Sequence, residues 1–84
     1  MTESTLDAVT TGRTRIDEID AALVALICER VDVSRQIQRA RVASGGPRVV
    51  TSRERELVQR WHAALGEAGG GIALRLLDLS RGPL

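Results

Sequence analysis

The sequence predicts an all-α protein of three helices per chain that pairs with a second copy of itself. Its 84 residues suffice for one domain, covering residues 1–84. Residues 11–43 contain no proline and, after Gly12, no glycine, while apolar residues recur there at spacings of three and four. Trp61 is the single aromatic residue, so the core must be aliphatic, which suits packed helices.

The first predicted helix runs through residues 11–43, after a start at residues 1–10 that we expect to be frayed. Its apolar stripe consists of Ile16, Ile19, Leu23, Leu26, Val33, Ile37 and Ala40. A helix of roughly 30 residues would be about 45 Å long, longer than a globular domain of this size is wide. The same helix of a second copy is the natural partner for the stripe, which predicts an intertwined six-helix homodimer.

Two smaller helices are predicted after the break at residues 44–47, Ser-Gly-Gly-Pro. The medium helix begins at Thr51 or Ser52 and carries Leu57, Val58, Trp61 and Leu65 on one face. The glycine-rich residues 66–71 are predicted to be a flexible connection. A short third helix follows over residues 72–80, and residues 81–84 form a C-terminal tail.

The charge balance and composition exclude several classes of function. Twelve basic residues, all arginine, and 11 acidic residues give a net charge of +1, which argues against nucleic acid as a partner. No segment is apolar enough for a membrane span or a signal peptide, so we expect a cytoplasmic protein without membrane contact. Single Cys28 and His62 residues are too few for an internal disulfide or a zinc site.

A set of arginines stands out against this background. Arg30 falls on a core position of the stripe, where a guanidinium needs an anion or other acceptors. Arg41 returns to the same face about 16 Å further along the helix. If the second helix folds back, the loop delivers Arg53 and Glu54 nearby. Converging arginines with one acid predict a pocket for a small dianion, held by bidentate contacts.

The same residues resemble a known family, the all-helical chorismate mutases. The resemblance covers residues 13–84 and is carried by Arg13, Ile16, Asp20, Leu26 to Arg30, Arg39 to Arg41, and Arg53 with Glu54. The loop at residues 43–46 and the ending at residues 79–82 are similar to the short actinobacterial intracellular branch. The resemblance implies a cofactor-free, metal-free isomerase that rearranges chorismate to prephenate in phenylalanine and tyrosine biosynthesis.

The resemblance also implies a role for each matching residue, in active sites shared between two protomers. Arg30 would hold one substrate carboxylate and Arg53 would contribute to carboxylate binding, while Arg13 would reach across from the other protomer. Arg41 would stand beside the ether oxygen of the breaking bond, and Glu54 would accept a hydrogen bond from the ring hydroxyl. Val50 replaces an acidic residue of some relatives, so its contact would come from the backbone.

Structural alternatives remain open for several of these residues. Arg30 could form an ion pair with Glu29 or Asp32 of a neighbouring helix. Glu54 could instead complete a capping box with Thr51 at the start of the second helix. Arg41 could lie on the surface near the end of a helix, where positive charge is favourable. Arg48 is equally compatible with ligand binding and with solvation.

Alternatives of function remain as well. Short relatives are activated by the enzyme DAHP synthase through their C-terminal tail, so the same activation is expected here, although Pro83 departs from their pattern. A glutamine near the end of the third helix of longer relatives has no match, and Ser80 is a weak substitute. Three other functions compete with this one: a mutase for amino-deoxychorismate, an isochorismate-pyruvate lyase, and a non-catalytic helical dimer or adaptor.

Overall fold

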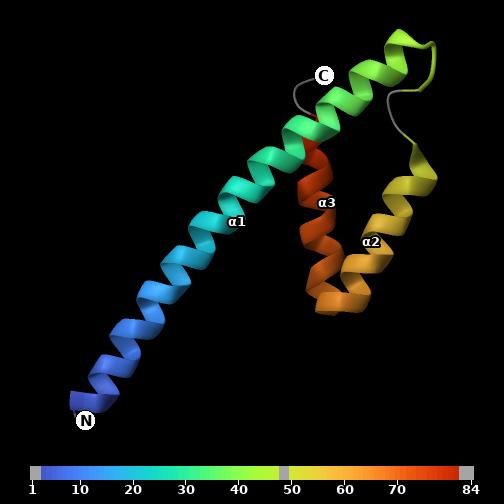
Figure 1. The fold of residues 1–84 in the computed structure, drawn as a ribbon. Helices are drawn as coiled ribbons and strands as arrows, with labels where there is room; N and C mark the ends of the chain where they lie inside the picture. Colours follow the sequence, from blue (N-terminus) through green and yellow to red (C-terminus); the bar gives the residue numbers. More distant parts are fainter. Residues whose placement is uncertain (1–2, 48–49, 82–84) are drawn as a thin grey trace.

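The described part of the chain forms three helices (Figure 1). The structure is a computed structural model, which describes residues 3–47 and 50–81. Helix α1 covers Glu3–Ala43, α2 covers Thr51–Leu65 and α3 covers Glu67–Arg81. No strand occurs among the described residues, so the predicted all-α class of three helices is confirmed.

Helix α1 starts earlier than the sequence predicts. It begins at Glu3 rather than near residue 11, so residues 3–10 are helical where a frayed start is expected; residues 1–2 lie outside the described part. The reason is that Leu6 and Val9 continue the apolar spacing toward the N-terminus. Gly12 alone does not end the helix, because one interior glycine costs only about 1 kcal/mol.

The end of α1 is fixed by the two glycines that the sequence marks as breakers. Gly45 has a positive φ of 83°, which glycine adopts without steric penalty. Its N–H donates to the Val42 carbonyl at 3.0 Å, and the Gly46 N–H donates to the Arg41 carbonyl at 2.7 Å. This Schellman arrangement satisfies the last carbonyls of α1 and turns the chain toward α2.

Helices α2 and α3 form an antiparallel hairpin that Gly66 alone connects (Figure 1). The predicted flexible connection at residues 66–71 is wrong, since residues 67–71 form the first turns of α3. The glycines there serve close packing: a Cβ on Gly69 would lie 2.8 Å from the Leu65 Cβ and even nearer the Trp61 carbonyl oxygen. The third helix is therefore 15 residues long, as long as α2.

Replacing Gly69 with alanine is expected to destabilise the fold by about 1–3 kcal/mol, the usual cost of forcing extra volume into a packed contact. The matched control is Gly71→Ala, because a Cβ at Gly71 meets nothing within 4 Å. The control should be neutral or stabilising by up to about 1 kcal/mol, since alanine favours helix. Urea unfolding followed by circular dichroism measures both, and equal stability of the two variants would refute the packing role of Gly69.

Hydrogen bonds from α1 hold the C-terminal end of α3 in place. Arg35 Nη2 donates to the Leu79 carbonyl and Gln38 Nε2 donates to the Ser80 carbonyl, both at 3.4 Å. The buried Ser80 hydroxyl donates to the Leu76 carbonyl at 2.8 Å. The last carbonyls of a helix have no partner within it, so these donors from α1 satisfy two of them and hold the end of α3 against α1.

The apolar stripe of α1 lies largely outside the chain's own core. The molecule measures 64 × 24 × 17 Å, and the N-terminal half of α1 projects away from the other helices (Figure 1). Ile16, Leu23 and Leu26 remain 56%, 51% and 61% exposed. Among the described residues, no helix is long and apolar enough to cross a membrane.

Candidate active site

Two adjoining cavities lie where the C-terminal half of α1, the start of α2 and the end of α3 meet. The first, of about 70 Å³, is lined by Ser34, Ile37, Gln38, Arg41, Val50, Arg53, Glu54, Leu77, Ser80 and Arg81. The second, of about 270 Å³, is lined by Arg30, Arg53, Glu54, Leu57, Arg60, Trp61 and Leu77. We call the two cavities together the hollow, since Arg53, Glu54 and Leu77 line both.

The lining of this hollow is strongly cationic. In the part of the chain that the structure describes, it contains five arginines, Arg30, Arg41, Arg53, Arg60 and Arg81, against a single acid, Glu54. Guanidinium groups bind carboxylates through two parallel hydrogen bonds, and in a partly enclosed space water screens them less than on an open surface. The hollow is therefore suited to an organic anion with more than one negative charge.

Helix α1 contributes the two arginines that the sequence places on one face. Arg30 lines the larger cavity and Arg41 the smaller one, and both are half-buried. Ser34 and Gln38 lie between them on the same face at helical spacing. Among the residues that the structure describes, neither guanidinium has a hydrogen-bond or ion-pair partner within the chain, so both remain available to an anion.

The first turn of α2 supplies Val50, Arg53 and Glu54. Val50 is the N-cap residue, with φ −112°, and its carbonyl accepts the N–H of Arg53 at 3.1 Å and of Glu54 at 3.2 Å. Within residues 50–81 no side chain caps this helix, so the capping box considered for Thr51 and Glu54 does not form. Arg53 lies 3.7 Å from Glu56 in a solvent-exposed ion pair, which contributes little and leaves Arg53 free to turn inward.

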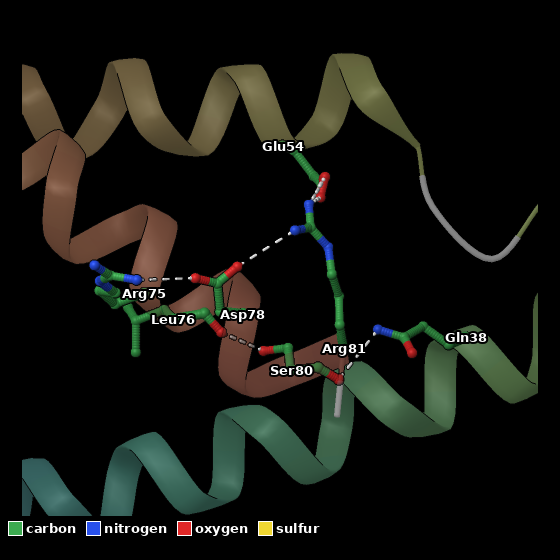
Figure 2. A network of polar contacts seen from close by, with 7 residues as sticks. All are labelled: Gln38, Glu54, Arg75, Leu76, Asp78, Ser80 and Arg81. Carbon is green, nitrogen blue, oxygen red and sulfur yellow. Dashed lines mark hydrogen bonds and ion pairs between the residues drawn. The ribbon is translucent and has the colours of Figure 1, made fainter. Parts of the chain in front are cut away.

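Glu54 is held by a residue that the sequence did not single out. Arg81, in the last turn of α3, donates from Nη2 to both carboxylate oxygens of Glu54, at 2.9 Å to Oε2 (Figure 2). Its Nη1 also donates to Asp78 Oδ1 at 3.4 Å. Arg60, which lines the larger cavity from α2, was not predicted either. The antiparallel pairing of α2 and α3 would have indicated Arg81, because it places the end of α3 beside the start of α2, where Glu54 lies.

One expected site residue lies elsewhere within the chain. Arg13 is on the projecting half of α1, 17 residues before Arg30, which corresponds to about 25 Å of helix. It is exposed and lines neither cavity. Arg48 lies outside the described residues.

Fold and hollow together define a class: a small all-helical protein with an arginine-lined pocket suited to a small organic anion. Residues 12–76 match the family model described as chorismate mutase type II. The chain therefore belongs to the type II chorismate mutase family. The predictions of family and of chorismate mutase activity, an isomerase function, are thereby confirmed.

Individual relatives agree with this assignment. The chain is 49% identical over 72 residues to the intracellular chorismate mutase of Mycolicibacterium smegmatis, covering 86% of this chain and 69% of that protein. It is 45% identical over 76 residues to that of Mycobacterium tuberculosis, covering 90% and 71%. A solved complex of DAHP synthase and chorismate mutase from Corynebacterium glutamicum, with a bound transition state analog, matches with a TM-score of 0.87 and 29% identity, over 95% of this chain and 96% of that one.

Proposed function

We propose that the arginine-lined hollow binds chorismate and converts it to prephenate in phenylalanine and tyrosine biosynthesis. The observation that carries the proposal is the lining of the hollow, in which five arginines surround one glutamate. The chain's membership of the chorismate mutase family supports it. Chorismate is a small dicarboxylate, so its charge complements this lining. The relatives named intracellular support a cytoplasmic location.

Substrate binding is divided between two elements in this proposal. Arg30 of α1 and Arg53 of α2 line the same cavity and hold carboxylates through bidentate contacts. The backbone of Val50 borders the substrate at the start of α2, where an acidic side chain is absent. Fixing both carboxylates selects the compact conformer of a flexible molecule, which removes much of the entropic part of the barrier.

Arg41 and Glu54 act on the reacting ring in this proposal. The rearrangement breaks a carbon–oxygen bond and forms a carbon–carbon bond within one molecule, so no atom enters or leaves and no nucleophile is needed. Negative charge grows on the ether oxygen in the transition state, and the half-buried Arg41 guanidinium stabilises it there. Glu54 accepts a hydrogen bond from the ring hydroxyl and so orients the ring.

The functional unit in this proposal is an intertwined homodimer, in which residues 1–84 of each copy form one domain. The exposed stripe of α1 supports it, because apolar side chains such as Leu23 and Leu26 would otherwise face water. In the same dimer, Arg13 of the partner copy completes each site. Pairing of the projecting halves of α1 brings Arg13 toward a hollow that it does not reach within its own chain.

We further infer that DAHP synthase is a partner of this chain. The support is the solved Corynebacterium glutamicum complex, in which a chorismate mutase of the same fold is bound to DAHP synthase. Saturating DAHP synthase from the same organism is expected to raise kcat/KM for chorismate by between about 5-fold and 150-fold, the usual range of coupling between sites. Consumption of chorismate, followed by absorbance with and without the partner, measures the effect. Equal turnover in both samples would contradict this partnership.

A further inference from the structure

We propose that Arg81 is a positioning residue for the reaction, which fixes the Glu54 carboxylate at the hollow and prevents it from neutralising the substrate-binding arginines. The inference rests on the proposed function, in which Glu54 meets the ring hydroxyl of the substrate. Arg81 does not bind the substrate in this account. It acts through Glu54.

The contact between Arg81 and Glu54 is well placed for this role. One guanidinium nitrogen, Nη2, bonds to both carboxylate oxygens, and charge-assisted bonds of this kind are about twice as strong as neutral ones (Figure 2). The Glu54 side chain is only 20% exposed and that of Arg81 39%, so the pair is less screened than a surface ion pair. The contact therefore restricts the rotamers of Glu54.

The backbone of Arg81 is itself held in place from α1. The neighbouring Ser80 is buried, and its carbonyl accepts a hydrogen bond from Gln38. The Arg81 side chain is steadied further by Asp78, one turn earlier on α3. Arg81 therefore reaches Glu54 from a helix end that is anchored on α1, and this anchorage makes it suitable for positioning another side chain.

The charges around Glu54 explain why it needs a dedicated partner. Arg30 and Arg41 line the same hollow as Glu54, and neither has an ion-pair partner among the described residues. A Glu54 released from Arg81 could turn to either of them and cancel a charge that the substrate carboxylates require. By occupying Glu54, Arg81 leaves these arginines to the dianion. The carboxylate has about four lone-pair sites, so it keeps capacity for the substrate hydroxyl.

A double-mutant cycle tests the inference. Arg81→Ala, Glu54→Gln and the double variant are compared with the original chain for chorismate turnover and for binding of a dicarboxylate transition-state analogue by calorimetry. Arg81→Ala is expected to lower kcat/KM by at least about 10-fold, mainly through a higher KM, because the released Glu54 competes for the arginines. In the Glu54→Gln background the same substitution should change kcat/KM by less than about 2-fold.

Two further variants separate positioning from folding. Arg75→Ala is the matched control, because Arg75 also pairs with Asp78 on α3 but does not contact Glu54; it should leave turnover unchanged. Arg81→Lys keeps the charge without the planar fork and should retain an intermediate activity, which provides the cycle if the alanine variant does not fold.

The outcomes distinguish this inference from the proposed function. An equal loss from Arg81→Ala in both backgrounds, no loss, or a gain in turnover would each overturn the positioning role. A loss from Glu54→Gln with no effect of Arg81→Ala would leave the proposed function standing without the inference. Glutamine still offers a carbonyl acceptor, so the role of Glu54 itself is tested by Glu54→Ala. No effect of that variant on turnover or analogue binding would refute the role of Glu54, and the inference with it.

Discussion

Replacing Arg41 with alanine is expected to lower kcat/KM for chorismate by about 100- to 1,000-fold, the usual cost of removing one preorganised group from a developing oxyanion. Arg41 is half-buried in the smaller cavity, where a fixed guanidinium interacts with growing charge more strongly than water does. Because the interaction strengthens in the transition state, most of the loss should be in kcat rather than in KM. Steady-state measurement of chorismate consumption gives both constants.

Arg39→Ala is the matched control for this prediction. Arg39 lies on the same turn of α1 and has the same side chain, yet it is exposed and lines neither cavity. It should keep kcat/KM within about 2-fold, as expected for a surface substitution. An Arg41→Ala variant as active as Arg39→Ala would show that Arg41 does not stabilise the transition state.

Replacing Leu23 with aspartate is expected to abolish both the dimer and the activity. In the single chain Leu23 is 51% exposed, on the stripe that we propose as the dimer seam. The substitution removes about 2 kcal/mol of apolar burial from each copy and adds the larger cost of burying a carboxylate. Sedimentation velocity and circular dichroism should show a shift to monomer together with loss of helix, since a long isolated helix has little to pack against.

Ala21→Asp introduces the same charge on the same helix as a control. Ala21 is also exposed and lies about 200° around α1 from Leu23, away from the stripe. This variant should remain dimeric and active. A Leu23→Asp chain that stays dimeric with full helix content would refute the proposed seam.

Much of the fold could be predicted because the relevant signals are local. The start of α2 near Thr51 and the end of α1 at Ala43 follow from residues that break or favour helices in any context. The start of α3 could not be predicted in this way, since glycines usually mark loops. Gly69 lies inside a helix because α3 approaches the Trp61 carbonyl too closely for any side chain. That constraint is visible only once two helices are packed together.

The candidate site shows the same division. Arg30 and Arg41 could be placed on one face from helical spacing within α1, and both line the hollow. Glu54 was expected there too, but its partner Arg81 is 27 residues away on another helix. Predicting that contact requires knowing how α2 and α3 align. The predicted start of the third helix at residue 72, instead of Glu67, made that alignment impossible to work out. Arg13 was assigned by resemblance, and within its own chain it is exposed and lines neither cavity.

Mixing two inactive variants tests most directly whether active sites are shared between two copies. Chains with Arg13→Ala and chains with Arg41→Ala are unfolded together in equal amounts, refolded and assayed for chorismate consumption. In a mixed dimer one site receives both substitutions and the other receives neither. About a quarter of the original activity should therefore return, because half of the dimers are mixed. A mixture of Arg30→Ala and Arg41→Ala should regain none, since each copy damages its own site. If the first mixture also stays as inactive as its separate components, Arg13 does not cross to the partner and the shared site is wrong.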